Sequence, residues 1–398
     1  MDFDESPEEA AFRAEARAWL EQAADTLQAR GIREGAPSLD RDWVARAKPW
    51  QAHLAENGWA GITWPADSGG RGGTPAQAAI FVEESARAGL PANAFAVGIA
   101  MAGPTIIAHG TEAQRRRFLP PMLRGDEVWC QLFSEPGAGS DLAGLSTRAV
   151  RDGDEWVVNG QKVWTSGAHY SDLGILLARS DPDRPKHRGI TYFLVDMHAP
   201  GIMVRPLRQL TGDAEFNEVF FEHVRVPASN ILGGVNRGWE VGITTLMYER
   251  LALGFGLQAR FQIVLDSVLG LARRTRRNGG TAAQDPVLRQ KLAQLVIDNA
   301  VFKYTGARAI TRLLRGERPG PEASAGKIWW CERHQALQET AQELMGLYGQ
   351  IGKGSPWAVD QGLWQYAFLR SRANSIEGGT TEIQRNIIGE RVLGLPKD

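Results

Sequence analysis

Apolar residues change their spacing twice along this chain of 398 residues, and the two changes divide it into three parts. Up to about residue 125 they recur every three to four positions, as on one face of a helix. Between residues 128 and 227 short β-branched and aromatic runs replace that pattern, and the helical period returns after Gly233-Gly234. We therefore predict an α+β protein with an α-helical domain (1–125), a compact antiparallel β domain (126–232) and a C-terminal α-helical bundle domain (233–398).

Sequence signals also predict individual helices. Ser6 with Glu9 and Thr111 with Gln114 have the spacing of capping boxes, which begin helices. In the last part we expect four long helices, at 238–277, 285–315, 321–347 and 356–372. The stretch 89–110 contains no Lys, Arg, Asp or Glu, but it is rich in Ala and Gly and broken by prolines. We interpret it as a buried helix, with packing or a substrate channel as its role, rather than as a membrane span.

Four runs in the middle part are typical of strands: Glu155–Val158, Leu173–Ala178, Ile190–Val195 and Val219–Val226. Asn159-Gly160 lies between the segments Trp156–Val158 and Gln161–Trp164. An Asn-Gly pair in that position is a strong signal for a two-residue turn. We therefore expect a β-hairpin at Asn159-Gly160.

Composition narrows the class of protein. Forty-five basic against 46 acidic residues give a formal net charge of −1, which argues against a nucleic-acid or membrane-surface protein. Cys130 and Cys331 form no CxxC, and the acidic N-terminus does not resemble a signal peptide, so we expect a reduced, cytoplasmic protein without stable membrane insertion. The seven histidines show no HxxxH or HExxH spacing, so no metal site is predicted.

Two segments of the middle part carry groups suited to binding a flat cofactor. The run 134–141 (SEPGAGSD) places small residues between hydroxyl and carboxylate side chains, so its backbone N–H groups can converge on a ligand. Trp164-Thr165-Ser166 offers an aromatic face followed by hydroxyl donors. No Walker A sequence and no GxGxxG after a strand accompany them, so neither a P-loop nor a Rossmann site is supported.

The segment 375–384 (SIEGGTTEIQ) combines paired glycines with two threonines and a carboxylate. Glycine permits a tight turn and a close approach of backbone to ligand. Glu377 stands just before the glycines, whereas a second carboxylate, Glu249, lies far upstream on a predicted helix. Which glutamate faces the substrate is left open by the residues alone.

Together these segments resemble the acyl-CoA dehydrogenase family over essentially the whole chain. The resemblance rests on SEPGAGSD, on 159–167 (NGQKVWTSG) and on 378–396 (GGTTEIQRNIIGERVLGLP). It implies an N-terminal helical domain, a β-barrel domain and a four-helix bundle. It also implies FAD as cofactor, an acyl-CoA substrate oxidised to the 2,3-enoyl-CoA, and electron-transfer flavoprotein as the electron acceptor.

The resemblance assigns roles residue by residue. The flavin contacts implied are Phe133, Ser134, Gly139, Ser140, Trp164, Thr165, Ser166, Thr380, Thr381 and Glu382. Ser140, Arg250, Gly378 and Gly379 are implied at the substrate thioester. An arginine just after the first bundle helix is expected to contact the FAD pyrophosphate of a neighbouring subunit, and Arg274 and Arg276 are the candidates.

The catalytic base requires a choice. Many family members carry it directly before the Gly-Thr of the closing loop, but here that position is Gly378. Isovaleryl-CoA and long-chain acyl-CoA dehydrogenases carry it instead in a Glu-Arg-Leu run, which resembles Glu249-Arg250-Leu251. We therefore expect Glu249 to be the base, with Glu377 as the alternative.

The resemblance leaves the assembly and two rival functions open. A homotetramer or homodimer is expected, and a heterotetramer with a second acyl-CoA dehydrogenase chain is the alternative. The rivals are an oxidase or monooxygenase of the same fold, and a non-catalytic subunit of a heterotetrameric dehydrogenase. The presence of Glu249 disfavours the monooxygenases, which do not need it.

Overall fold

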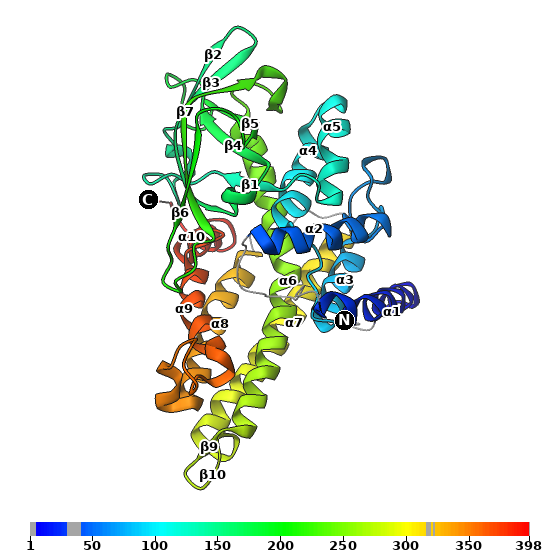
Figure 1. The fold of residues 1–398 in the computed structure, drawn as a ribbon, viewed down its shortest axis with the longest axis vertical. Coiled ribbons are helices and arrows are strands. Elements are labelled where there is room, and N and C mark those ends of the chain that lie inside the picture. Colours follow the sequence, from blue (N-terminus) through cyan, green and yellow to red (C-terminus); the bar gives the residue numbers. More distant parts are fainter. Residues whose placement is uncertain (1–4, 30–40, 316–319, 321–322, 398) are drawn as a thin grey trace. The chain divides into compact units, whose positions relative to one another are not determined.

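The computed structural model describes residues 5–29, 41–315, 320 and 323–397 (Figure 1). The helices are α1 (Pro7–Ala29), α2 (Arg41–Glu56), α3 (Pro75–Arg87), α4 (Gly103–His109), α5 (Glu112–Arg124), α6 (Gly238–Arg274), α7 (Pro286–Leu314), α8 (Ala323–Met345), α9 (Leu363–Ser371) and α10 (Thr381–Arg391). The strands are β1 (Trp129–Leu132), β2 (Arg148–Asp152), β3 (Glu155–Ser166), β4 (Leu173–Arg179), β5 (Ile190–Asp196), β6 (Ile202–Leu207), β7 (Phe216–Pro227), β8 (Ile231–Leu232), β9 (Arg276–Arg277) and β10 (Gly280–Thr281). The order helical, then β, then helical is as predicted.

The chain divides into two compact units. The sheet unit comprises Ala14–Ala78 and Ala88–Ala252, and the bundle unit comprises Met1–Arg13, Ala79–Arg87 and Leu253–Asp398. Helix α6 begins in the sheet unit and ends in the bundle unit.

The sheet unit is built on an eight-stranded sheet in the order β6-β7-β3-β2-β4-β5-β8, with β1 beside β4. Most neighbours are antiparallel, as predicted, but β4 pairs in parallel with both β1 and β2, so the sheet is mixed. Strands β4 and β5 are buried along almost their whole length, which matches their continuous apolar sequences. Strands β7, β3 and β2 are neighbours in this sheet and lie side by side in Figure 1.

The hairpin predicted at Asn159-Gly160 is wrong, because β3 runs unbroken through both residues. Both halves of β3 pair with β7, and the register shifts between them: Asn159 alone lies opposite Glu222 and His223. His223 has a φ of +53° and its N–H donates to Asn159 Oδ1 over 2.9 Å. A Cβ at Gly160 would lie 2.7 Å from Thr147 Cα, so glycine is needed here for close packing rather than for a turn.

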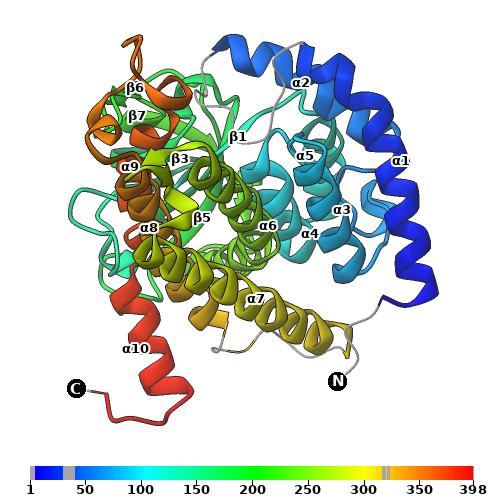
Figure 2. The ribbon, with the colours of Figure 1, turned by 90° about the horizontal axis from the view of Figure 1, so that it is seen from below.

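In the bundle unit, α8 packs against α7, α9 and α10, and α7 and α8 run side by side in Figure 2. Its core contains buried leucines and aromatic residues from α6, α7 and α8. Three of the four predicted bundle helices are confirmed. The fourth begins at Leu363 and not near residue 356, since Asp360, Gln361 and Gly362 have left-handed backbone angles. Helix α10 was not predicted.

The uncharged stretch 89–110 is helical only in its second half. A π-helical turn, Gly98–Ala102, leads into α4, and both are largely buried. A Cβ at Gly103 would lie 2.0 Å from Trp64 Cζ2, so this glycine lets the indole pack flush against the helix. The Trp64 indole N–H donates to Ile99 O within the π turn. Among the described residues no helix is long and apolar enough to cross a membrane.

Both predicted capping boxes are present. Ser6 Oγ accepts from Glu9 N, and Glu9 Oε2 accepts in return from Ser6 N, at the start of α1. Thr111 and Gln114 exchange the equivalent hydrogen bonds at the start of α5.

Candidate functional site

Trp164 occupies an unusual position on β3. Lys162 pairs with Val219 and Thr165 with Asn217, so two residues of β3, Val163 and Trp164, lie opposite one residue of β7. This bulge gives Trp164 a φ of +61°, which is rare for a bulky residue. The indole is 61% exposed although it is a large aromatic group. Backbone strain and an exposed aromatic side chain at one residue indicate a binding function rather than a packing role.

Hydroxyl groups flank the exposed indole. Ser166, two residues further along β3, is also exposed, and Ser134 is held close to this strand because its carbonyl accepts from Val163 N over 2.9 Å. The loop that continues from Ser134 is open: a Cβ built on Gly137 or Gly139 meets nothing within 4 Å. Trp164 and Ser166 are therefore both exposed on this strand, and the backbone of Ser134 lies beside it.

Thr165 faces the opposite way from its two neighbours. It is 1% exposed, its carbonyl accepts from Asn217 Nδ2 over 2.9 Å, and its hydroxyl has no hydrogen-bond partner among the described residues. Phe133 is buried at the end of β1, whereas Gly139 and Ser140 are exposed. Of the flavin contacts predicted in the sheet unit, Trp164, Ser166, Gly139 and Ser140 are thus exposed, whereas Thr165 and Phe133 are buried.

A buried ion pair fixes the loop to β3. Lys162 is completely buried, and its ammonium donates to Glu135 Oε1 over 2.8 Å and to Phe133 O over 3.0 Å. The Glu135 carboxylate also accepts from the backbone N–H groups of Ser146 and Thr147 and from the Ser146 hydroxyl. The two hydrogen bonds of Lys162 join the 133–147 segment to the strand that carries Trp164, and those of Ser146 and Thr147 hold the Glu135 carboxylate within the segment.

Burial and charge act in opposite directions on this pair. Burial would raise the pKa of Glu135, but the Lys162 charge and hydrogen bonds overcome it and lower the pKa to about 2. Burial lowers the pKa of Lys162 to about 8 in spite of the attraction of Glu135. The lowered pKa of Glu135 favours the folded state at neutral pH, whereas the lowered pKa of Lys162 opposes it. The hydrogen bonds of Lys162 fix the geometry of the loop against β3.

The Glu135 carboxylate should make the protein sensitive to acid. Its folded-state pKa of about 2 lies below the ordinary 4.5, so the unfolded state binds more protons in between and stability is lost as the pH falls through that window. We expect the free energy of unfolding to fall less steeply between pH 4.5 and pH 2 in Glu135→Gln than in the wild type, measured by urea unfolding. Glu112→Gln, at an exposed carboxylate of α5, should keep the wild-type slope. An unchanged slope in Glu135→Gln would contradict the assigned pKa.

Glu249 and Arg250 lie on the part of α6 that belongs to the sheet unit. Both side chains are half-buried, and the Arg250 Nε donates back to Leu246 O over 3.2 Å. The first turns of α6 pack closely on β5, since a Cβ at Gly238 would lie 2.5 Å from the Thr191 carbonyl carbon. The helix that carries Glu249 is therefore anchored firmly within this unit.

The predicted closing segment lies in the bundle unit. Gly378 and Gly379 have φ values of +63° and +84°, so both need the freedom of glycine. Thr380 caps α10, because its hydroxyl accepts from Ile383 N over 3.2 Å, and Thr381 is buried while Glu382 is exposed. Glu377 is exposed and forms an ion pair of 3.0 Å with Arg370. The alternative base is therefore neutralised within its own unit.

Hydrogen bonds anchor the turn that precedes this segment. Asn374 is 5% exposed, its carbonyl accepts from Cys331 Sγ and from Lys327, and its amide contacts His334 Nδ1 over 2.7 Å. Burial lowers the pKa of His334 to about 4, so this histidine is neutral and holds Asn374 without a charge.

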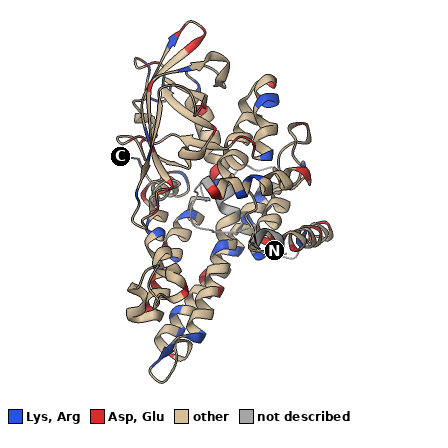
Figure 3. Ribbon diagram, viewed as in Figure 1, with Lys and Arg blue, Asp and Glu red and all other residues tan. Residues whose placement is uncertain are grey.

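The two candidate arginines differ in their surroundings. Arg274, at the end of α6, forms an ion pair with Asp360. Arg276 is exposed on β9 and has no ion-pair partner among the residues that the structure describes. Basic residues gather at this tip of the bundle unit, near β9 and β10 (Figure 3).

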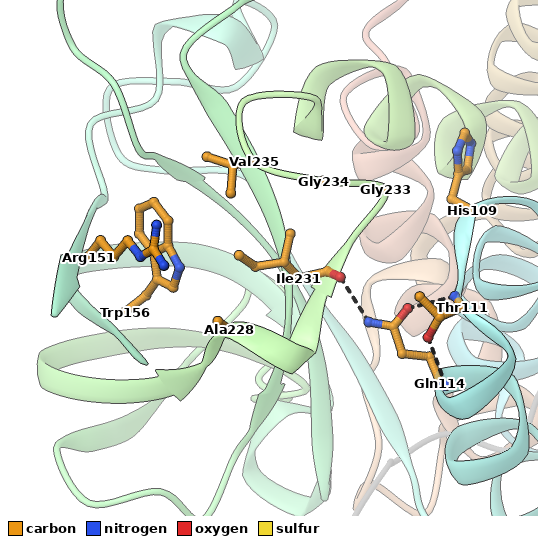
Figure 4. Close-up of a pocket in the computed structure, with 10 residues that line it drawn as sticks. All are labelled: His109, Thr111, Gln114, Arg151, Trp156, Ala228, Ile231, Gly233, Gly234 and Val235. Atoms are coloured by element: carbon orange, nitrogen blue, oxygen red, sulfur yellow. Dashed lines mark hydrogen bonds between the residues drawn. The ribbon is translucent and has the colours of Figure 1, made fainter. Parts of the chain in front are cut away.

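A separate pocket of about 460 Å³ lies in the sheet unit (Figure 4). Its lining residues are His109, Thr111, Gln114, Arg151, Trp156, Ala228, Ile231, Gly233, Gly234 and Val235. Gln114 donates to Ser229 O and Ile231 O across one edge. None of the residues predicted for the site lines this pocket.

Two supporting residues, Glu135 and Lys162, were missed as site residues from the sequence. The signal was a lysine two positions before the tryptophan on the same predicted strand segment, and a glutamate in the glycine loop. A buried lysine requires a partner, and Glu135 was the available carboxylate.

The chain is similar to known proteins over almost its whole length. Models of the acyl-CoA dehydrogenase N-terminal, middle and C-terminal domains match residues 6–126, 130–224 and 236–393. Acyl-CoA dehydrogenase IpdE1 of Mycobacterium tuberculosis is 40% identical over 395 residues, covering 97% of this chain and 98% of that protein. The solved structure of the Tcur3481-Tcur3483 steroid ACAD matches with a TM-score of 0.86 and 33% identity over 100% of both chains. The ChsE4-ChsE5 complex from Mycobacterium tuberculosis matches with a TM-score of 0.86 and 32% identity, also over 100% of both chains.

Proposed function

Because the chain belongs to the acyl-CoA dehydrogenase family, we propose that it oxidises the Cα–Cβ bond of an acyl-CoA thioester with Glu249 as the base for the α proton. As a member of this family the chain is an FAD-dependent oxidoreductase acting on acyl-CoA. The observation that carries the choice of base is the contrast between two glutamates. Glu249 is half-buried on an anchored helix, whereas Glu377 is exposed in the closing segment. A base on a rigid element is held in the geometry that proton abstraction needs.

FAD, when bound, supplies the acceptor for the β hydride. We propose that the Trp164 indole packs on its ring system and that the hydroxyls of Ser134 and Ser166 bind the ring edge. The donor set supports this, since an exposed indole flanked by hydroxyls suits a flat ring rich in hydrogen-bond acceptors. The open glycines of the 134–141 loop leave room for a ligand beside the backbone.

We propose a steroid side chain as the acyl group. The support is the similarity to the steroid ACAD, a likeness that extends over both chains at full length. The segment 98–109 contains three alanines and two glycines, which is compatible with a bulky substrate. We further propose electron-transfer flavoprotein as the acceptor of the electrons.

A comparison of CoA thioesters tests the reaction and the substrate class separately. The purified protein is mixed anaerobically with the CoA thioester of a steroid side-chain acid, with isovaleryl-CoA and with octanoyl-CoA, and loss of flavin colour is followed. We expect the steroid thioester to reduce the flavin fastest. Faster reduction by octanoyl-CoA would refute the substrate class alone. No reduction by any of the three would refute the reaction.

We propose that Arg276, rather than Arg274, binds the FAD pyrophosphate of a neighbouring subunit in a dimer or tetramer. The support is that Asp360 already neutralises Arg274, whereas Arg276 is exposed. Arg276→Ala should weaken FAD binding by about tenfold, the loss of one charged hydrogen bond, with little change in the thermal unfolding midpoint. Arg274→Ala is the matched control and should leave FAD affinity within about twofold. The reverse order of the two affinities would assign the contact to Arg274.

A further inference from the structure

A chain of buried hydroxyl groups crosses the sheet unit beside the helix of the proposed base. Thr245 of α6 contacts Thr105 of α4 and Tyr192 of β5, with both oxygen–oxygen distances 3.0 Å. All three side chains are completely buried. Neither the resemblance nor the proposed reaction assigns them a role, and three buried hydroxyls from separate elements require an explanation.

The direction of these hydrogen bonds follows from the supply of hydrogens. Each hydroxyl donates only once. Thr105 donates to Met101 O over 2.7 Å, in the π-helical turn. The one hydrogen of Thr245 faces two acceptors, Thr105 Oγ1 at 3.0 Å and Val241 O at 3.2 Å, so in the contact between Tyr192 and Thr245 the phenol donates. Burial raises the pKa of the Tyr192 phenol, which keeps its donor hydrogen in place. The three hydroxyl oxygens form a continuous line of contacts from β5 through α6 to α4.

Two members of this chain, Thr245 and Tyr192, lie next to the proposed catalytic elements. Thr245 and Glu249 are four residues apart on α6 and so share one face of the helix. The Tyr192 ring packs edge-on against Phe133, with centroids 5.9 Å apart and planes at 87°. Phe133 directly precedes Ser134, and its carbonyl accepts from Lys162, two residues before Trp164. Contacts therefore run from the strand of Trp164 to the helix of Glu249.

We propose that Tyr192 and Thr245 are positioning residues, which fix the Glu249 turn of α6 relative to the Ser134–Trp164 face. This rests on the proposed function of Glu249 and deepens it. Neither residue contacts the reacting atoms. Their hydroxyls select one placement of α6 against β5 and α4, and a displacement of about 1 Å at the base can slow a reaction by about 10².

Thr244, the residue directly before Thr245 on α6, provides a matched control. The Thr244 hydroxyl contacts His109 Nε2 over 2.8 Å, so it too links α6 to the end of α4. It lies five residues before Glu249 and therefore points about 140° away from it around the helix. Loss of the Thr244 hydroxyl removes an interhelical hydrogen bond of the same kind without touching the hydroxyl chain.

The test compares Thr245→Val, Tyr192→Phe and Thr244→Val in the FAD-bound protein, with the thioester that best reduces the wild-type flavin. We expect Thr245→Val and Tyr192→Phe to slow flavin reduction by about 10- to 100-fold, with the dissociation constant of the thioester within about twofold. Exchange of the thioester α proton in D₂O, measured by mass spectrometry, should slow in parallel. Thr244→Val should change neither rate by more than about twofold, and Thr245→Ser should restore most of the rate.

Thermal unfolding separates positioning from simple loss of stability. Thr244→Val and Thr245→Val should lower the unfolding midpoint by similar amounts, since each loses an interhelical hydrogen bond. Rates for Thr245→Val no lower than those for Thr244→Val would overturn the positioning role. Wild-type rates in Glu249→Gln would instead overturn the assignment of the base, so the two failures are distinct.

Discussion

Replacement of Glu249 by glutamine is expected to slow flavin reduction by about 10²–10⁴, the range that loss of a general base produces. The amide has nearly the shape of the carboxylate but cannot take the α proton. FAD content and the affinity for the thioester should stay close to those of the wild type, because the change leaves α6 and its neighbours intact. Stopped-flow mixing under anaerobic conditions measures the rate directly.

The matched control is Glu377→Gln in the closing segment. Glu377 is exposed and paired with Arg370, so its loss should change the reduction rate by less than about fivefold. If Glu249→Gln keeps the wild-type rate while Glu377→Gln loses it, the base lies in the closing segment. Equal large losses in both variants would mean that the two carboxylates act together.

The second large effect is expected from Lys162→Met. This change leaves the Glu135 carboxylate buried without its counter-ion, which in buried pairs costs about 3–5 kcal/mol of stability. Because the pair ties the 133–147 segment to β3, the variant should also lose most of its FAD. Urea unfolding and the flavin absorbance of the purified protein measure the two effects.

A surface ion pair of the same motif provides the control for Lys162. Lys186 contacts Asp141 over 2.8 Å, and both side chains are more than half exposed. Lys186→Met should cost less than about 1 kcal/mol and leave FAD content unchanged. The double variant Glu135→Leu with Lys162→Met should recover part of the stability, because it removes the unpaired charge. If Lys162→Met is as stable as Lys186→Met, the buried pair does not hold the site.

Most of the fold could be predicted from the sequence where interactions between neighbouring residues determine the local structure. The capping boxes at Ser6 and Thr111 depend on neighbouring residues only, and both are present. The Asn159-Gly160 prediction failed because tertiary pairing overrode a local turn preference: β7 continues alongside both halves of β3. Helix α10 was not predicted, because the glycines at 378 and 379 are typical of a turn, although Thr380 is also a helix cap.

The residues that carry the chemistry of the candidate site could be predicted from the sequence, but the residues that hold them in position could not. Trp164 was identified by its aromatic face, yet its left-handed conformation follows from a register shift that only the pairing of β3 with β7 reveals. Tyr192, Thr245 and Thr105 come from three separate elements, so no sequence spacing could join them. Long-range geometry of this kind depends on the assembled sheet and helices.

An anaerobic titration of the purified wild-type protein with the best CoA thioester, with the product identified by mass spectrometry, tests the dehydrogenase function most directly. We predict a yellow protein whose flavin loses its colour with about one equivalent of thioester, and a product that is two hydrogens lighter. A colourless protein, or a yellow one that keeps its colour with every thioester, would contradict the proposed reaction.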